Sequence, residues 1–167
     1  MKVTPCCFFH RSRVADKVQI TADRIEPDKL RDELLDRGAG AYVSFEGWIR
    51  DHNDGQEVLR LEYEVYEPVA IKEGEKVIEE ARKKFPLLHV ACVHRSGLLE
   101  IGECAVWVGV TSAHRDEAFE ACRYIIDQVK VRLPIWKKEH YVEGHSGWVN
   151  CERCAEHGHD HSVMSRS

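Results

Sequence analysis

Two long segments of the chain repeat apolar residues at helical spacing, and each runs into a proline. The first segment covers residues 70–85 and ends at Pro86, and the second follows Ser112, which is expected to cap it, and is stopped by Pro134. The stripes consist of Ile71, Val77, Ile78, Ala81 and Phe85 in the first helix, and of Ala118, Phe119, Cys122, Ile125, Ile126 and Val129 in the second. Each stripe predicts a helix with one buried face.

The segments between the helices are rich in β-forming residues and are separated by short polar turns. The expected strands are residues 18–25, 41–49, 59–65, 88–94 and 105–111. The polar turn at residues 51–55 predicts a hairpin of the second and third strands, and the last two strands look like a second pair. A third helix is expected to begin at Pro27 and to close at Gly38. Short turns and three main helices indicate an α+β fold with a largely antiparallel sheet.

The composition limits the class of protein. A chain of 167 residues with 43% hydrophobic residues is sufficient for one domain. The net charge of -5 gives no overall basic field for nucleic acid or an anionic membrane, and no apolar run approaches the roughly 18 residues of a membrane span. Seven cysteines, an odd number, favour a reducing compartment over a disulfide framework. We therefore expect a soluble, cytoplasmic protein.

The chain divides into three parts on composition. Residues 17–150 are expected to form the domain, residues 1–16 are a leader without an assigned role, and residues 151–167 form a Cys/His-rich tail. The domain contains no glycine-rich phosphate loop, no GxSxG turn and no HExxH helix. Nucleotide chemistry and serine or zinc hydrolysis therefore lose most of their support.

The most unusual segment, residues 127–139, places four basic residues around a proline and a tryptophan. Lys130 and Lys137 could both reach from a partly apolar wall into one pocket, where desolvation would lower the pKa of a lysine and make it a base or nucleophile. The alternative is that Lys130 and Arg132 only complement the helix dipole, each contributing roughly 0.3–1 kcal/mol.

Two further basic sites are separated from this segment in the sequence. His114 and Arg115 stand where a strand gives way to a helix, which suits either an anion site or an ordinary capping turn with a surface arginine. Arg50 ends a predicted strand and is either a third ligand for the same anion or a solvated side chain. These sites form one pocket only if the fold brings them together.

Four motifs carry a resemblance to a known family. They are FEGWIR at residues 45–50, LEYEVY at 61–66, SAHR at 112–115 and PIWKKE at 134–139. In this order and spacing, over roughly residues 39–149, the chain resembles the large, catalytic subunit of molybdopterin synthase. The resemblance implies an α/β hammerhead fold and a homodimer within a heterotetramer. It also implies a small ubiquitin-like partner whose Gly-Gly end carries a thiocarboxylate, the sulfur donor that converts cyclic pyranopterin monophosphate into molybdopterin in two transfers, with no cofactor.

The resemblance also implies roles for individual residues. Lys130 would assist transfer at the thiocarboxylate carbonyl, and Lys137 would contact the pterin or act as its acid or base. The implied substrate-binding residues are Trp48, Ile49, Arg50, His114, Arg115, Lys130, Lys137, Lys138 and Glu139. Phe45 and Trp48 would line a channel for the tail of the partner. Because the donor is a thiocarboxylate, Cys92, Cys104 and Cys122 are most simply core residues.

The tail departs from the family pattern. Its ligand types and spacing are those of a structural zinc site or of a disordered tail that binds metal adventitiously, and the candidate ligands are Cys151, Cys154, His157, His159 and His161. Arg153 lies between the two cysteines and is left out of the site. A second hypothesis for the whole chain is therefore a non-catalytic zinc-binding interaction module. Deleting residues 151–167 would abolish that function, whereas Lys130→Ala would abolish sulfur transfer.

Overall fold

The computed structural model describes residues 16–142 and 144–149 of the chain. Its helices are α1 (Pro27–Glu33), α2 (Glu67–Lys84) and α3 (Arg115–Arg132). Its strands are β1 (Lys17–Thr21), β2 (Ala41–Trp48), β3 (His52–Asn53), β4 (Gln56–Val65), β5 (Leu87–Arg95), β6 (Gly97–Glu100), β7 (Cys104–Ser112), β8 (Ile135–Tyr141) and β9 (Ser146–Val149). Within these ranges no helix has the length and apolarity needed to cross a membrane.

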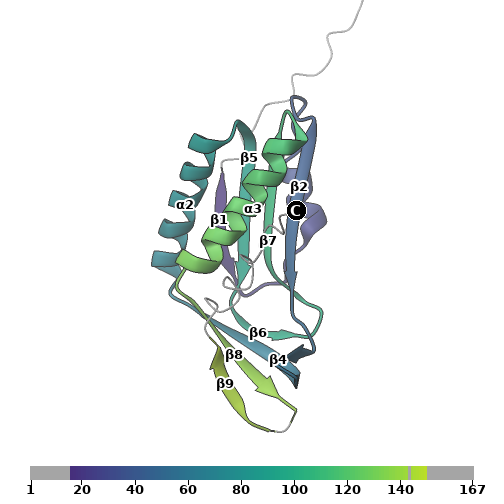
Figure 1. Ribbon diagram of the computed structural model, residues 1–167, viewed down its shortest axis with the longest axis vertical. Coiled ribbons are helices and arrows are strands. Elements are labelled where there is room, and N and C mark those ends of the chain that lie inside the picture. The colour runs from purple at the N-terminus through teal and green to yellow at the C-terminus, as the bar shows by residue number, and fades with distance from the viewer. Residues whose placement is uncertain (1–15, 143, 150–167) are drawn as a thin grey trace, which may run out of the picture.

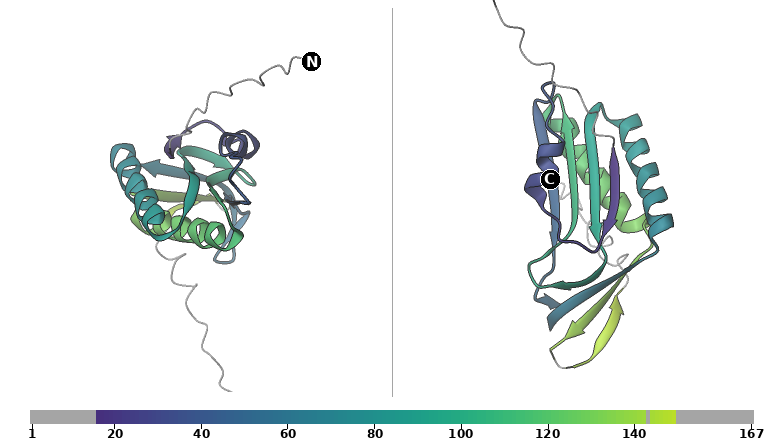
Figure 2. Two further views of the ribbon diagram at one scale, coloured as in Figure 1. Left: turned by 90° about the horizontal axis from the view of Figure 1, so that it is seen from above. Right: turned by 180° about the vertical axis from the view of Figure 1, so that it is seen from behind.

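The larger part of the molecule is a four-stranded sheet in the order β1-β5-β7-β2. The β1–β5 pair is parallel and the other two pairs are antiparallel. Helices α2 and α3 lie side by side on one face of the sheet, and α1 lies on the other (Figures 1 and 2). The main core lies under α2 and α3, where Val77, Val108 and Ile125 are fully buried. A smaller core around Trp107 and Leu34 lies under α1.

A second sheet lies at one end of this layered body, as the lower part of Figure 1 shows. Its strands follow the order β3-β4-β8-β9, and β6 also pairs with β4. Helix α3 ends at Arg132, Pro134 prevents its continuation, and β8 begins at Ile135. The C-terminal end of α3 therefore opens directly onto the second sheet.

The expected α+β class with three helices and mainly antiparallel pairing is confirmed, but the expected hairpin of residues 41–49 and 59–65 is wrong. Strand β2 pairs with β7, while β4 pairs with β8 along almost its whole length. Only a two-residue piece, β3, turns back onto the start of β4. The chain leaves the first sheet at Ile49 and enters the second, so the polar turn connects two sheets instead of closing one hairpin.

Several predicted ends of elements are also corrected. Strand β1 ends at Thr21 and α1 ends at Glu33, well before Gly38. Ser112 does not cap α3, because it is the last residue of β7 and its hydroxyl donates to the carbonyl oxygen of Pro86. The N-cap residue of α3 is His114, which makes no side-chain capping bond.

The smaller core predicts a strong dependence of stability on Trp107, which is fully buried between the sheet and α1. Trp107→Ala should lower the free energy of unfolding by about 3–5 kcal/mol, because it removes a large apolar contact and leaves a cavity. Trp136→Ala is the matched control, since Trp136 is half exposed and should change stability far less. Urea unfolding followed by circular dichroism measures both, and equal losses would contradict the assigned packing.

Candidate active site

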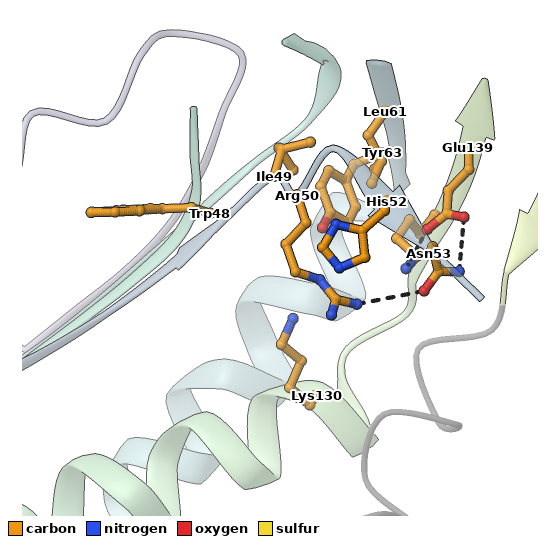
Figure 3. Close-up of a pocket in the computed structure, with 10 residues that line it drawn as sticks. Trp48, Ile49, Arg50, His52, Asn53, Leu61, Tyr63, Lys130 and Glu139 are labelled. Atoms are coloured by element: carbon orange, nitrogen blue, oxygen red, sulfur yellow. Dashed lines mark hydrogen bonds and ion pairs between the residues drawn. The ribbon is translucent and has the colours of Figure 1, made fainter. Parts of the chain in front are cut away.

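A pocket of about 130 Å³ opens where the C-terminal end of α3 meets the second sheet (Figure 3). It is lined by Trp48, Ile49, Arg50, His52, Asn53, Leu61, Tyr63, Lys130, Lys137 and Glu139. These residues come from the segment between the two sheets, from β4, from α3 and from β8. Three basic side chains that are far apart in the sequence, Arg50, Lys130 and Lys137, thus share one cavity.

Lys130 reaches the pocket from the last turns of α3. Its neighbour Val129 is buried in the main core, and this fixes the rotation of the helix that presents Lys130 to the cavity. Leu133 and Ile135 form an apolar wall beside it. Among residues 16–142 and 144–149, no carboxylate lies within ion-pair distance of its amine. Its amine, which points toward Arg50 in Figure 3, is therefore available to a ligand.

A buried histidine, His94, lines a small cavity together with Lys130 and is uncharged at neutral pH. His94 packs edge-on against Tyr63, with ring centroids 5.0 Å apart. Its Nδ1 lies 2.7 Å from the carbonyl oxygen of Arg95, so Nδ1 carries the proton and donates. Burial lowers the pKa of His94 to about 4. His94 therefore adds no positive charge beside Lys130.

Lys137 and Glu139 form an ion pair that is buried in the wall of the pocket. Lys137 Nζ lies 2.8 Å from Glu139 Oε1, and the two residues are only 8% and 2% exposed. Both lie on the same face of β8, because side chains alternate along a strand. Ion pairing leaves Lys137 with a fixed orientation that Lys130 does not share.

Glu139 is held as a carboxylate by three donors. Besides Lys137, Asn53 Nδ2 donates to Oε2 at 2.9 Å and the hydroxyl of Tyr141 donates to Oε2 at 2.6 Å. Burial alone would raise the pKa of Glu139, but the hydrogen bonds from Lys137 and Tyr141, with smaller help from Asn53, hold it below its ordinary value. The same contact with Glu139 raises the pKa of Tyr141.

Arg50 lines the pocket at a solvent-exposed position. It is exposed, follows the buried Ile49, and donates from Nη2 to Asn53 Oδ1 at 3.5 Å. Trp48 also lines the pocket but lies toward its margin in Figure 3, with its indole N–H donating to Glu46 at 3.0 Å. The guanidinium and the two ammonium groups give the cavity the electrostatic character of an anion site.

Four of the expected site residues do not line the pocket, and two of them, Lys138 and Phe45, belong to strands close to it. Lys138 points to the opposite face of β8 from its neighbours in sequence and stacks on Trp148, with its amine 5.5 Å from the ring centroid. Phe45 is partly exposed on β2 and does not line the cavity. The pocket thus contains Trp48 from the expected tail channel, without Phe45.

His114 and Arg115 lie at the far end of α3. Both are exposed at its N-terminus, and the 15 residues from there to Lys130 correspond to about 22 Å of helix. Within a single chain these two residues do not meet the pocket. Of the basic residues that are separated in the sequence, three lie together in the pocket: Arg50, Lys130 and Lys137.

Several pocket residues were not expected from the sequence. Leu61 and Tyr63 fit the alternation of a half-buried strand and signal only a core position. His52 and Asn53 lie in a polar run that resembles any turn. The only sequence signal for His52 and Asn53 is the Asp54-Gly55 pair that follows them. Asp-Gly is typical of a two-residue hairpin turn, and such a turn would hold the residues next to it in a defined conformation.

The candidate zinc ligands, Cys151, Cys154, His157, His159 and His161, lie outside the described residues, as does Arg153. In the ranges that are described, no three His, Cys, Asp or Glu side chains are grouped to hold a metal. Of the three cysteines there, Cys92 and Cys122 are buried and Cys104 is partly buried, and burial raises the pKa of each thiol. These thiols therefore lie in the core, as expected.

The fold belongs to a class of solved structures from molybdenum cofactor synthesis. A molybdopterin synthase from Staphylococcus aureus superposes with a TM-score of 0.74 and 36% sequence identity, covering 78% of this chain and 94% of that one. A molybdopterin biosynthesis MoaE protein from Burkholderia ambifaria gives 0.70 and 30%, covering 86% and 98%. A complex of subunits 1 and 2 of molybdopterin-converting factor from Helicobacter pylori shares the fold at 21% identity, with a TM-score of 0.64 over 75% and 85% of the chains.

The sequence match agrees with this class. Residues 20–132 match the family model described as "MoaE protein", and the chain belongs to that family. A molybdopterin synthase catalytic subunit from Thermoplasma volcanium is 44% identical over 131 residues, which covers 78% of this chain and 96% of the relative. The counterpart from Bos taurus is 38% identical over 139 residues, covering 83% and 74%. Members of this family are enzymes of molybdenum cofactor biosynthesis.

The low pKa of Glu139 predicts an acid-sensitive contribution to stability. A carboxylate whose folded pKa lies below its ordinary value of 4.5 stabilises the fold above that pH, and the contribution is lost as the pH falls through the folded pKa. Glu139→Gln should cost about 3 kcal/mol at neutral pH, because Lys137 is left buried without its partner. Its stability should also depend less on pH between about pH 6 and pH 3 than that of the wild type.

The control for this prediction is Glu64→Gln, because Glu64 is exposed on β4 and lies opposite Trp136. This variant should keep both the neutral-pH stability and the acid sensitivity of the wild type. Urea unfolding across the pH range measures all three proteins. An acid-induced loss in Glu139→Gln as steep as in the wild type would rule out the assigned role of the carboxylate.

Proposed function

We propose that this chain acts as the catalytic subunit of a molybdopterin synthase and transfers sulfur from the thiocarboxylated end of a small partner protein to cyclic pyranopterin monophosphate. One observation carries the proposal: Arg50, Lys130 and Lys137 line a single pocket. Glu139 neutralises only Lys137, so the cavity keeps an excess of positive charge, which suits a substrate that carries a phosphate and a donor that carries a thiocarboxylate.

The two lysines differ in their surroundings, and this difference supports different roles. Lys137 is paired with Glu139 and is fixed in the wall, which suits a cation that binds and orients the pterin. Lys130 has no carboxylate partner within the described chain and stands beside an apolar wall, which suits a group that contacts the thiocarboxylate carbonyl. There its ammonium would stabilise the negative charge that develops on the oxygen during transfer.

Each transfer then follows simple chemistry. The thiocarboxylate sulfur forms a bond to a side-chain carbon of the pterin, and a carbon–oxygen bond of that carbon breaks, so that the oxygen leaves as water in one transfer and stays on the phosphate, as the cyclic ester opens, in the other. The bond between the sulfur and the terminal glycine carbonyl carbon then breaks when water attacks the carbonyl. The partner leaves with a carboxylate in place of its thiocarboxylate, and the sulfur stays on the pterin. Two such events give the dithiolene, and no redox change is required.

His114 and Arg115 join this scheme only if a second copy of the chain supplies them. They lie about 22 Å from Lys130 along α3, so one chain cannot use both ends of the helix for one small substrate. A homodimer with the N-terminus of α3 of one copy near the pocket of the other would add a histidine and an arginine to the anion site. This arrangement accounts for the expected homodimer.

The remaining expectations stay predictions. They are the small ubiquitin-like partner with its Gly-Gly thiocarboxylate, the heterotetramer, the cytoplasmic location, the absence of a cofactor in the reaction and the zinc in the C-terminal tail. The solved complex of two converting-factor subunits from Helicobacter pylori agrees with a two-subunit enzyme. Nothing in the described residues favours the zinc-module hypothesis over sulfur transfer.

The different roles proposed for Lys130 and Lys137 predict different kinetic effects when each is replaced by alanine. Lys130→Ala should lower the rate of dithiolene formation by at least about a hundredfold, because it removes the cation at the reacting carbonyl. Lys137→Ala should also raise KM for the pterin, since it removes a binding cation. Lys138→Ala is the matched control on the opposite face of β8 and should stay within about threefold of the wild type. Mass spectrometry of the product measures each rate.

If each active site contains residues from both copies of the dimer, two inactive variants should restore activity to each other when they are mixed. Lys130→Ala and Arg115→Ala homodimers, mixed under conditions that allow subunits to exchange, should regain about a quarter of the wild-type rate, since half of the dimers are mixed and each has one intact site. Each variant alone stays low. If the mixture is no more active than the variants, the second copy does not supply Arg115 and the proposed arrangement fails.

A further inference from the structure

The side chain of Asn53 lies between two oppositely charged residues of the pocket, Arg50 and Glu139. Its amide nitrogen donates to Glu139 Oε2 at 2.9 Å, and its amide oxygen accepts from Arg50 Nη2 at 3.5 Å (Figure 3). A guanidinium can only donate and a carboxylate can only accept. One amide therefore bonds to both groups, and only one orientation of that amide makes both bonds.

The backbone holds Asn53 in this place. Asn53 pairs with Gln56 across a two-residue turn, in which Asp54 and Gly55 have positive φ angles of 48° and 79°. These angles are typical of the type I′ turn that closes tight hairpins. The N–H of Val58 also donates to the carbonyl oxygen of Asp51 at 2.8 Å. The direction of the Asn53 side chain is thus set before any ligand binds.

Asn53 also separates two groups that would otherwise attract each other. Arg50 is exposed and its side chain is long, so without the amide it could turn toward Glu139 and form a direct ion pair. Such a pair would occupy the guanidinium that faces the cavity. It would also compete with Lys137 for the carboxylate, which Lys137 contacts at 2.8 Å.

We propose that Asn53 is a positioning residue that keeps Arg50 directed at the anionic substrate and Glu139 paired with Lys137. The role of Asn53 rests on the proposed function, since it concerns the binding of the pterin phosphate by Arg50. Asn53 does not touch the reacting atoms, and it acts through the two charged residues on either side of it.

The kinetic test compares Asn53→Ala with the wild type at saturating thiocarboxylated small subunit and varied cyclic pyranopterin monophosphate. Asn53→Ala should raise KM for the pterin about tenfold, as expected for loss of a hydrogen bond to charged groups, and change kcat by less than about threefold. KM for the small subunit should not change. A merely structural role would lower the amount of active protein and leave KM for the pterin unaltered.

Two further variants test the hydrogen bonds that Asn53 makes to Arg50 and Glu139. Asn53→Asp keeps an acceptor for Arg50 but sets a second carboxylate against Glu139, so it should impair the enzyme more as the pH rises and both carboxylates ionise. Gln56→Ala is the matched control in the same hairpin, because its side chain contacts His145 on the surface and does not line the pocket. Gln56→Ala should keep the wild-type KM and kcat.

A measurement without turnover tests the same contact. In a ¹³C NMR titration of the Glu139 carboxyl, Asn53→Ala should raise the midpoint, because it removes a donor to the carboxylate, and Gln56→Ala should not. If folded Asn53→Ala retains both the wild-type KM and the wild-type titration, the positioning role is overturned. If the wild type makes no dithiolene product, the proposed function fails instead, and the titration alone decides the role of Asn53.

Discussion

A carboxylate buried in the second sheet is the constraint on which the site depends. Glu139 is almost fully excluded from solvent, and a buried charge is costly unless it is paired and hydrogen-bonded. Lys137 from the same strand, Tyr141 two residues further on, and Asn53 from β3 satisfy it. Meeting this requirement brings the segment after β2 against β8 and fixes the wall into which Lys137 is set.

The first sheet serves this site by orienting α3. The apolar stripe of α3 packs on β7 and β2, and this packing determines which side of its last turns faces the second sheet. Pro134 then ends the helix and redirects the chain into β8. Lys130 and Lys137, seven residues apart, therefore reach one cavity from two kinds of element. Only Lys137 is neutralised by an ion pair, and this difference allows the two lysines to have different roles.

Strand β8 was not predicted as a strand, although its residues Lys137 and Glu139 were expected in the site. Its buried positions are Ile135, Lys137 and Glu139, while Trp136 between them is half exposed. Alternation is present, but the charged residues are inside and the aromatic residue is outside, so hydrophobic patterning gives no strand signal. The wrong hairpin has a related origin, because the turn at residues 51–55 contains a real two-residue hairpin, and sequence does not reveal that the long strands beside it belong to different sheets.

The sequence by itself determined the three helices, the β-rich segments, the α+β class and the family, because helix stripes, proline stops and short motifs are local patterns. It also singled out Lys130, Lys137 and Arg50 by residue type. Only the tertiary structure decided that these three share a pocket while His114 and Arg115 stand at the other end of a rigid helix. It also revealed Asn53, since a hydrogen bond spanning 86 residues of sequence has no local signature. Long-range pairing depends on which strands meet, and that is a property of the whole fold.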